Sequence, residues 1–427
     1  MNQPLHHQQF ASRIHRAGPV AVLDIGSSKI ACIVAHPMTE HGSALMQVKG
    51  VGTYASKGLR AGMVTDMEAA EKSIRAAVEA AERMADTTIE NVLVGISSTA
   101  LQSQTYNVTE PLNGYAVDDD ILSSALLQAR DKCASEQVEL LHAIPVSYKI
   151  DNGPNVQDPR GMHGDMLRVT THVMTAPITP VRNLLLCIEK SHLTIDRLIA
   201  TPYASALSCL VEDEADLGAT VIDLGAGTTG FTVFFEGAPI YTAILPIGAH
   251  NITTDIAQIL NIPVEQAERL KMMHGSAWSD TTAIHENVNI LPIGENDPSQ
   301  IQAIDRAQLT QIIRPRLEEI FELVREKIES SALSQFVGRR VILTGGGAQL
   351  TGVEDLAAQI LEKQVRRGRP MRMAGLPEAA SGPAFAASTG LVTYAYKRPN
   401  DYLYQNPSHT GFWGRFGQLG NWFKRNF

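Results

Sequence analysis

Two short turns of small residues each follow an aspartate at the end of a β-rich run. The first lies in "VAVLDIGSSKIACIV", which contains Asp24, and the second in "ATVIDLGAGTTGFTVFF", which contains Asp223. Turns of glycine and serine let backbone N–H groups approach a phosphate, because no larger side chain intrudes. The aspartates are suited to hold the waters of Mg²⁺, which keeps most of its hydration shell. The residue types therefore predict phosphate and metal binding.

Further donors follow each aspartate. Serine and threonine hydroxyls add to the backbone amides, and Lys29 adds a positive charge for the β- and γ-phosphates. A third segment, Gly345-Gly346-Gly347, lies between a β-rich run and a helical pattern, where a nucleoside or an α-phosphate can lie against backbone. The predicted nucleotide ligands are Gly26, Ser27, Ser28, Lys29, Gly225, Ala226, Gly227, Thr228, Thr229, Gly345, Gly346 and Gly347. The predicted Mg²⁺ ligands, through water, are Asp24 and Asp223.

Each of these segments alone is also common in proteins that bind no nucleotide. An Asp-x-Gly unit is often only a turn, and three glycines often only connect a strand to a helix. The two aspartates, however, lie 199 residues apart, which is too long for a solenoid repeat and suits two similar halves across a cleft. The combination resembles the ATPase fold shared by actin, sugar kinases and heat-shock chaperones. The chain has no Walker A sequence, so a P-loop enzyme is not expected.

Several elements must position these residues. Each aspartate lies in a predicted β-hairpin, because β-rich runs flank its turn. Helical periodicity appears at residues 66–85, 261–275 and 306–333. A strand-rich and turn-rich stretch runs from about Ile89 to His172.

The composition is that of a globular protein with two to four folding units. The chain has 427 residues, of which 44% are hydrophobic and 19% charged, and a net charge of −9. This acidity argues against nucleic-acid binding, and the four widely separated cysteines indicate neither a zinc site nor a disulfide framework. The N-terminus lacks the apolar core of a signal peptide, and no run reaches the roughly 20 apolar residues of a spanning helix. We therefore expect a protein that stays inside the cell.

The C-terminal segment "GFWGRFGQLGNWFKRNF", residues 411–427, combines six aromatic residues with three cations and no acid. Phenylalanines and one leucine recur at helical spacing along one stripe, and two tryptophans flank it. A helix of this length is about 25 Å long, too short and too charged to span a bilayer, so it should lie in the interface. The predicted membrane-binding residues are Phe412, Trp413, Arg415, Phe416, Leu419, Trp422, Phe423, Lys424, Arg425 and Phe427.

The alternative for this segment is a C-terminal helix that docks on its own protein or forms a dimer seam. The absence of acidic residues, the flanking tryptophans and the linker composition of residues 398–410 favour an anionic membrane surface.

Over almost its full length, the chain resembles the FtsA family of bacterial cell-division proteins. Besides the nucleotide motifs and the tail, the resemblance rests on "SKGLRAGMVTDM" (56–67), "VLVGISSTALQSQ" (92–104) and "LLHAIPVSYKIDNGPNVQDPRGMHGDMLRV" (140–169). These middle stretches have no role in general ATPase chemistry, so they separate this family from its relatives.

The resemblance implies an α/β, actin-like ATPase fold: two ribonuclease-H-like halves facing a nucleotide cleft, an inserted subdomain and a C-terminal amphipathic helix. It makes "TGGGAQL", with Gln349, the adenosine motif. It also implies that Glu268 and Lys271 contact the ribose and adenine, although by spacing alone they are an ordinary surface ion pair. The implied units are a flexible N-terminus (1–18), a first half (19–85, 166–204 and 381–397), an inserted subdomain (86–165), a second half (205–249 and 334–380), a helical subdomain (250–333), a linker (398–410) and a membrane-targeting helix (411–427).

The same resemblance implies the function. The expected protein binds ATP and Mg²⁺ and assembles with itself into filaments at the division septum, as a peripheral protein on the cytoplasmic side of the inner membrane. It would anchor the FtsZ ring through the C-terminal peptide of FtsZ and recruit later divisome proteins. Arg314 and Arg316 are candidate contacts for that peptide, or else solvated surface arginines.

Two alternatives share the nucleotide motifs. A cell-shape filament protein of the MreB type would lack "IPVSYKIDNG" and the inserted subdomain. A small-molecule kinase of the same fold needs a catalytic aspartate between the halves, and we find no good candidate for it.

One departure concerns catalysis. Some filament-forming relatives carry an acidic residue or glutamine near "DRLIATPYASAL", where it orients the attacking water. This chain has Ala200 and Thr201 before Pro202, with no carboxylate at that point. Because phosphoryl transfer depends on positioning the nucleophile, we expect ATP binding with weak or negligible hydrolysis.

Overall fold

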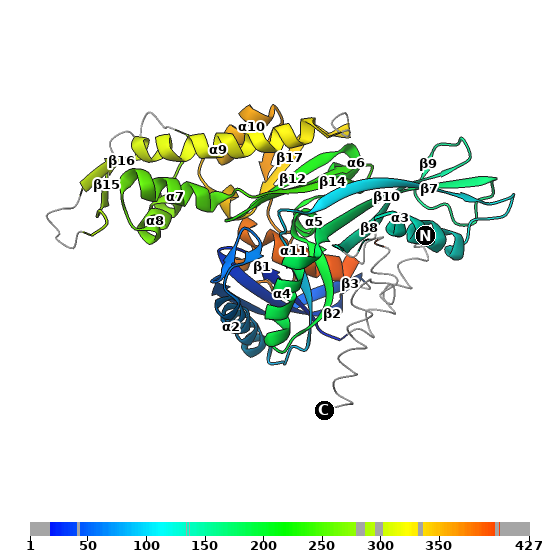
Figure 1. Cartoon of the computed structure of the whole chain (residues 1–427), viewed down its shortest axis with the longest axis horizontal. Coiled ribbons are helices and arrows are strands. Elements are labelled where there is room, and N and C mark those ends of the chain that lie inside the picture. Colours follow the sequence, from blue (N-terminus) through cyan, green and yellow to red (C-terminus); the bar gives the residue numbers. More distant parts are fainter. Residues whose placement is uncertain are drawn as a thin grey trace.

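The structure, a computed structural model, describes residues 18–40, 43–133, 135, 137–278, 287–294, 302–331, 336–397 and 401. Two five-stranded sheets form the centres of two halves, and a helical subdomain and a third sheet lie at opposite ends of the second half (Figure 1). The predicted membrane-binding residues of 411–427 lie outside the described residues. None of the helices that the structure describes is long and apolar enough to cross a membrane.

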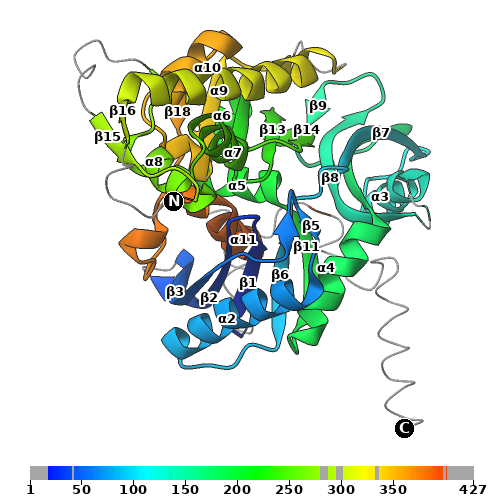
Figure 2. The same cartoon turned by 60° about the vertical axis from the view of Figure 1, so that its left-hand side comes forward.

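The first half is built on a mixed sheet in the order β11-β6-β1-β2-β3. Its strands and the small hairpin beside it are β1 (Val20–Ile25), β2 (Lys29–Glu40), β3 (Ser43–Ala55), β4 (Leu59–Arg60), β5 (Met63–Val64), β6 (Asn91–Ile96) and β11 (Thr194–Ala200). Helices α2 (Met67–Ala85) and α4 (Ile178–Lys190) cover one face, and α5 (Thr201–Cys209) and α11 (Ala386–Lys397) the other (Figure 2). The predicted hairpin at Asp24 is confirmed, since β1 pairs antiparallel with β2.

Helix α2 follows the prediction for residues 66–85 closely. The Asp66 carboxylate caps it by accepting hydrogen bonds from the N–H groups of Glu68 and Ala69, at 3.0 and 3.1 Å. Its buried face is rich in alanine and lies against glycines of β3. A Cβ on Gly52 would fall 2.0 Å from the Ala77 carbonyl oxygen, so the helix and the sheet approach more closely than larger residues allow.

The second half repeats this topology, with strand order β14-β13-β12-β17-β18. Its strands are β12 (Ala219–Leu224), β13 (Thr229–Phe235), β14 (Ala238–Leu245), β17 (Arg340–Thr344) and β18 (Gln364–Arg367). Like its counterpart β1, β12 pairs antiparallel on one side and parallel on the other. The connecting helices are α6 (Glu212–Leu217), η3 (Gly346–Gln349), α10 (Val353–Leu361), η4 (Glu378–Ala380) and η5 (Pro383–Phe385). Two equivalent halves that face each other are thus confirmed.

The helical subdomain extends from the second half. It contains α7 (Ala249–Leu260), α8 (Val264–His274), α9 (Arg306–Glu329) and the strand pair β15 (Asn287–Ile290) and β16 (Gln302–Asp305). Helix α9 buries Leu309, Ile313 and Leu317 along one stripe, as its periodicity predicts. Asp305 caps its start by accepting from the Ala307 N–H at 3.0 Å.

The inserted subdomain is a sheet in the order β7-β10-β8-β9, packed against one helix. Its elements are β7 (Gln102–Pro111), α3 (Asp119–Cys133), β8 (Val138–Ile150), β9 (Asn155–Val156) and β10 (Met166–Pro177). The strand pairing differs from the boundaries proposed for this subdomain at 86 and 165. Strand β6 lies inside those boundaries but pairs within the first sheet, whereas β10 lies outside them but pairs with β7 and β8. Helix α3 lies inside the stretch predicted as strands and turns.

Beyond α11, Asp401 is fully buried although it lies in the predicted linker at 398–410. Its carboxylate accepts hydrogen bonds from His142 Nδ1 and the Tyr394 hydroxyl, each at 2.7 Å, and from the Ala143 N–H at 3.1 Å. His142 Nε2 in turn accepts from the Ala200 N–H at 3.0 Å, so Nδ1 carries the ring proton. Burial by itself raises the pKa of the Asp401 carboxyl, but His142 and the other donors hold this pKa below its ordinary value.

Candidate functional site

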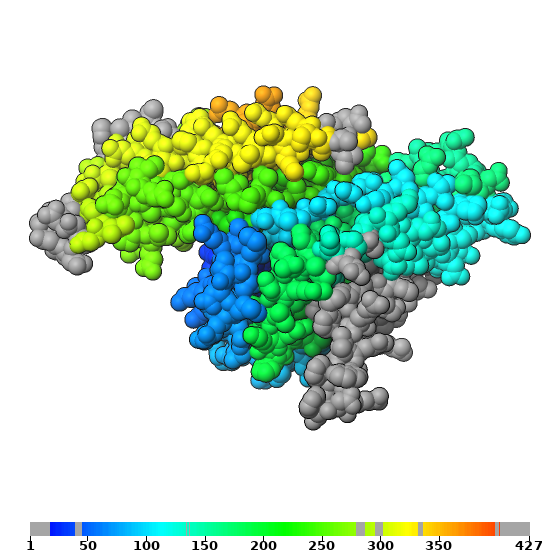
Figure 3. Space-filling view, in the orientation of Figure 1, coloured from blue at the N-terminus to red at the C-terminus, as the bar shows by residue number. Residues whose placement is uncertain are grey.

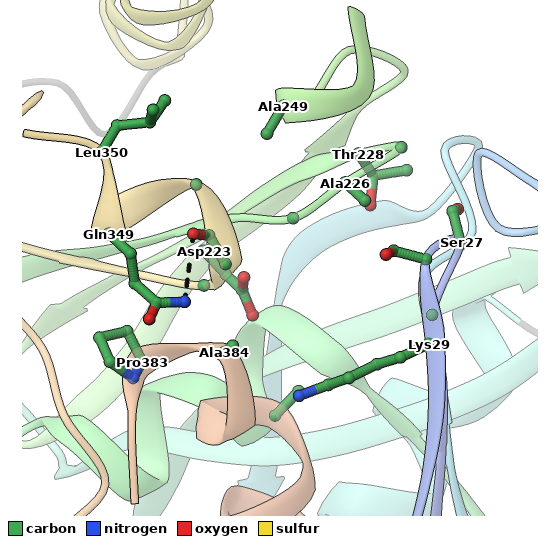
Figure 4. Close-up of a pocket in the computed structure, with 18 of the residues that line it drawn as sticks. Ser27, Lys29, Asp223, Ala226, Thr228, Ala249, Gln349, Leu350, Pro383 and Ala384 are labelled. Atoms are coloured by element: carbon green, nitrogen blue, oxygen red, sulfur yellow. Dashed lines mark hydrogen bonds between the residues drawn. The ribbon is translucent and has the colours of Figure 1, made fainter. Parts of the chain in front are cut away.

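The turns after the two aspartates are the same in both halves. The Gly26 N–H donates to the Lys29 carbonyl oxygen at 3.1 Å, and the Gly225 N–H donates to that of Thr228 at 3.0 Å. The loops face each other, since a Cβ on Gly227 would lie 2.5 Å from Ser27 Oγ. Figure 4 shows Ser27 opposite Ala226 and Thr228. The two turns thus bring backbone amides from both halves to one place.

The aspartates lie at the bottom of the space between these loops. The Ser388 hydroxyl of α11 donates to Asp24 Oδ2 at 2.8 Å, and that of Ser205 in α5 donates to Asp223 Oδ2. Burial raises the pKa of both carboxyl groups, against the opposing effects of these serines and Lys29. The pKa of Asp223 reaches about 6, with the negative charge of Asp24 adding to the rise. A divalent cation with its waters would relieve this unfavourable burial of two carboxylates.

Lys29 reaches from its strand toward the start of α11. Its Nζ lies 3.1 Å from the centroid of the Phe385 ring, a cation–π contact, and Figure 4 shows the side chain extending toward Ala384. Burial lowers the pKa of Lys29 to about 8, although Asp24 and Asp223 favour its charged form. The cation is therefore held near the two aspartates by the protein itself.

These groups line a cavity of about 440 Å³ between the halves, which we call the inner cavity. That volume is within the range of small-ligand sites, roughly 300–1,000 Å³. The predicted residues that line it are Asp24, Gly26, Ser27, Ser28, Lys29, Asp223, Gly225, Ala226, Gly227, Thr228, Glu268, Lys271, Gly345, Gly346, Gly347 and Gln349. The exception is Thr229, which was predicted as a ligand. It is buried at the start of β13, where strand alternation turns its hydroxyl away from the cavity, and it donates to the Ile247 carbonyl oxygen at 2.8 Å.

Glu268 and Lys271 are not the exposed pair that their spacing alone suggests. Lys271 is buried, and its Nζ donates to Glu268 Oε2 at 2.8 Å, to Thr253 Oγ1 at 2.8 Å and to the Ala249 carbonyl oxygen at 3.0 Å. The lysine thereby fixes α8 to the N-terminal turn of α7. Burial lowers the pKa of Lys271, while Glu268 opposes this change.

Close packing requires glycine at two of the three positions, Gly345 and Gly347. Gly345 has φ 88° and ψ 171°, which is essentially a glycine-only conformation, and a Cβ there would lie 2.3 Å from Asp223 Oδ1. A Cβ on Gly347 would lie 2.4 Å from Leu224 Cγ. Gly346 is open, with its nearest neighbour at 4.0 Å. The segment continues as the 3₁₀ turn η3, in which Gln349 Nε2 donates to the Gly346 carbonyl oxygen at 3.4 Å (Figure 4).

Further residues of the inner cavity were not predicted as ligands. Thr201 and Pro202 line it at the start of α5, and the Thr201 hydroxyl lies 2.7 Å from that of Ser97. Other lining residues are Met272, Met273, Arg306, Pro383, Ala384 and Ala387. Except for Arg306, whose guanidinium could bind phosphate, their types carry no local signal for phosphate binding, so only the fold brings them here. Among the described lining residues, the carboxylates are Asp24, Asp223 and Glu268.

The two arginines proposed as partner contacts lie outside this cavity, on α9. Arg314 Nε donates to Glu318 at 2.7 Å, and its guanidinium lies 5.1 Å from the Trp278 ring centroid. Arg316 binds Asp255 through two hydrogen bonds, of 2.7 and 3.0 Å, and also pairs with Glu319. Both charges already have partners within the protein, and Arg316 is the more firmly held.

Comparison with known proteins connects this site to one family. A family model described as "Cell division protein FtsA" matches residues 220–390, and a model described as "SHS2 domain inserted in FTSA" matches residues 99–175. The chain is 40% identical over 423 residues to a protein of Agrobacterium fabrum named cell division protein FtsA, with 96% of each chain covered. It is 30% identical over 382 residues to the protein of that name from Escherichia coli strain K12, covering 88% of this chain and 90% of the relative.

Solved structures support the fold. The chain of a PilM-PilN type IV pilus biogenesis complex aligns with a TM-score of 0.63 at 19% identity, over 89% of this chain and 99% of that one. MreB5 of Spiroplasma citri bound to ADP aligns with a TM-score of 0.53 at 12% identity, over 92% of this chain and 99% of that one. At these identities the likeness concerns the actin-like fold alone.

The glycine segment gives a test with a matched control. Gly345→Ala should lower the free energy of unfolding by about 2–4 kcal/mol, because it forces a methyl group onto Asp223 in a strained backbone. Gly346→Ala, where there is space, should change it by less than about 1 kcal/mol. Urea unfolding of both variants measures the difference, and equal effects would contradict the packing described for Gly345.

The raised pKa of Asp223 predicts a pH dependence of the ligand-free protein. Because the folded state holds the proton more tightly than the unfolded state, stability falls as the pH rises from 3.8 to about 6. Asp223→Asn should remove this slope and raise the free energy of unfolding at neutral pH by up to about 3 kcal/mol.

Urea unfolding between about pH 4 and pH 8 tests this expectation. Asp213→Asn, at an exposed aspartate of α6, is the control and should stay within about 0.5 kcal/mol. If Asp223→Asn is no more stable than the parent protein at neutral pH, the Asp223 carboxylate does not destabilise the folded state, and the prediction is wrong.

Proposed function

The chain belongs to the FtsA family of cell division proteins, and on that premise we propose that it binds Mg-ATP between its halves and tethers FtsZ to the cytoplasmic membrane. The observation that carries the nucleotide part is the convergence of two equivalent phosphate-type loops, two half-buried aspartates and a glycine segment on one cavity. In this proposal the protein acts at the division septum, as a peripheral protein on the inner face of the cytoplasmic membrane, and recruits later divisome proteins.

The described residues fit a nucleotide with a divalent cation. Backbone amides of both loops and the hydroxyls of Ser27 and Thr228 are the donors for phosphate oxygens. Asp24 and Asp223 would hold Mg²⁺ through its waters, and the cation would neutralise phosphate charge that the two carboxylates otherwise repel. Gly345, Gly346 and Gln349 offer backbone and a polar side chain to the nucleoside end, with Glu268 and Lys271 opposite.

ATP in this site acts chiefly as a structural ligand that closes the cleft. Of the carboxylates lining the described cavity, two are committed to the metal, and Glu268 is engaged by Lys271 and Thr253. Thr201 and Pro202 line the cavity and belong to the segment near which, by the family resemblance, some relatives carry a residue that orients water. Hydrolysis should therefore be slow. The same shortage of carboxylates disfavours a small-molecule kinase, which needs a further base for its substrate.

Membrane attachment is proposed from the sequence of residues 411–427. Three basic residues contribute about 1 kcal/mol each at an anionic surface, and the aromatic stripe adds several more, while ordering the segment offsets part of this. One tail should thus bind weakly, whereas several tails on one filament bind together with a large gain in avidity. We therefore propose that ATP-dependent self-association and membrane binding are coupled.

The helical subdomain is the proposed dock for the C-terminal peptide of FtsZ. An acidic peptide must compete with the carboxylates that already hold the α9 arginines. Arg314 is the better candidate of the two, because its partner Glu318 is more exposed than Asp255 and Trp278 offers an aromatic face beside it. Arg316 is held by a bidentate pair with Asp255, whose loss would disturb the packing of α7 on α9.

Liposome flotation tests the membrane proposal. We expect the whole chain to float with anionic liposomes, more so with Mg-ATP, and a chain ending at Thr410 to stay in solution. Phosphate release in the same samples should remain below about one turnover per minute. Flotation of both chains alike, or of neither, would contradict the proposed anchor, and rapid turnover would contradict the structural role of ATP.

Charge reversal tests the FtsZ dock. Arg314→Glu should weaken binding of an FtsZ C-terminal peptide by about fivefold to tenfold, because it removes a cation and adds a repulsive charge. Arg269→Glu, at an exposed arginine of α8 in the same subdomain, is the control and should change affinity by less than about twofold. Fluorescence anisotropy of a labelled peptide gives both values, and equal affinities for the two variants would exclude Arg314 as a contact.

A further inference from the structure

A small hairpin of the first half lies beside the two phosphate-type loops. Strands β4 and β5 pair through Leu59 with Val64 and through Arg60 with Met63. The two residues at the tip, Ala61 and Gly62, have φ values of 47° and 76°, as a two-residue type I′ turn requires. The hairpin lies within the segment "SKGLRAGMVTDM", which the family resemblance assigned to the first half without indicating its position beside the loops.

The hairpin is held rigidly at its base and its tip. The N–H groups of Thr65 and Asp66 both donate to the Gly58 carbonyl oxygen, at 2.8 and 3.1 Å, which closes the base at the start of α2. At the tip, a Cβ on Gly62 would fall 1.9 Å from the Ser97 carbonyl oxygen, so the turn packs directly on a residue of the inner cavity. The backbone N of Ala61 lies 3.1 Å from where a Cβ on Gly227 would be, which brings the tip to the second loop.

Arg60 precedes this tip and lines a second cavity, of about 780 Å³, which we call the outer cavity. The outer cavity shares Ser27, Ser28, Ala226, Gly227, Glu268 and Lys271 with the inner one, so both phosphate-type loops border the two cavities. The space-filling view shows a recess where the blue first half meets the green helical subdomain (Figure 3). The Arg60 side chain lines the outer cavity and is exposed.

Arg60 differs from the two lysines near the loops in having no acidic partner among the described residues. Lys29 is offset by Asp24 and Asp223, and Lys271 is paired with Glu268. Across the outer cavity, Glu265 lies in the first turn of α8, where the helix dipole already favours a negative charge. Within the part of the chain that the structure describes, no ion pair is formed by Arg60. A triphosphate between the loops would bring negative charge that the paired lysines only partly balance, next to this guanidinium.

We propose that Arg60 binds the terminal phosphate of a nucleoside triphosphate and so makes the site prefer triphosphate over diphosphate. The planar guanidinium suits two phosphate oxygens at once, and the rigid hairpin presents it without a large loss of backbone freedom. This inference rests on the proposed nucleotide binding. It adds that the hairpin, which belongs to the first half, senses the phosphate end of a ligand that also contacts the second half.

The test is the affinity of the full chain for Mg-ADP and for Mg-AMPPNP, a slowly hydrolysed triphosphate, by isothermal titration calorimetry. Arg60→Gln should weaken AMPPNP binding about tenfold and ADP binding less than about threefold, and Arg60→Lys should retain part of the difference. Arg83→Gln, at an exposed arginine about 24 Å along α2 from its first turn, should change neither affinity.

The other outcomes are distinct. Equal weakening of both nucleotides, matched by Glu265→Gln, would mean that Arg60 closes the cleft by pairing with Glu265, and would overturn the proposal. Unchanged affinities in Arg60→Gln would overturn it as well, while leaving nucleotide binding itself intact. If the unsubstituted chain binds neither nucleotide, the proposed function fails, and the role of Arg60 fails with it.

Discussion

The structure depends on placing two carboxylates, Asp24 and Asp223, close together in a largely buried gap. Each is the second-last residue of the central strand of its half, and each accepts a hydrogen bond from a serine hydroxyl of a helix packed between the halves. Those two helices, α5 and α11, can approach closely because Gly390 faces the backbone of Ala204, where a Cβ would lie only 1.8 Å from the carbonyl oxygen. The helix crossing, the serines and the aspartates therefore form one unit. The Mg²⁺ that we propose for this site would offset the negative charge of the two carboxylates.

The hairpins and the glycine segment could be predicted because their chemistry is local. A turn that approaches phosphate needs small residues, and a β-rich run on each side marks the hairpin, so Asp24, Asp223 and Gly345 were recognised from adjacent residues. Thr229 shows the limit of this reasoning, since one step along a strand turns a side chain to the opposite face. The burial of Lys271 could not be predicted from the sequence, because it depends on contacts with Ala249 and Thr253 of another helix.

The inserted subdomain shows the same limit on a larger scale. Helix α3 buries Leu122, Ala125, Leu126 and Ala129, a helical spacing that the surrounding strand-rich pattern obscured. The sequence did not show to which sheet β10 belongs, because this depends on its pairing with β8 and with the more distant β7. Once folded, the subdomain contacts both halves: the Ala200 N–H of the first donates to His142, and the Thr242 N–H of the second donates to Ser103 at 3.0 Å. Relative movement of the halves would therefore change the contacts that the inserted subdomain makes with them.

The burial of Asp401 sets how far the C-terminal segment can be from the folded body. The carboxylate is held between the insertion and α11, so Asp401 belongs to the folded body although it lies beyond the end of the helix. Nine residues separate this point from residue 411, and even a fully extended chain of nine residues spans only about 30 Å. A surface that holds the last seventeen residues would consequently hold the body within about one domain diameter. It would also hold it from a fixed side, because the point of attachment is part of the core.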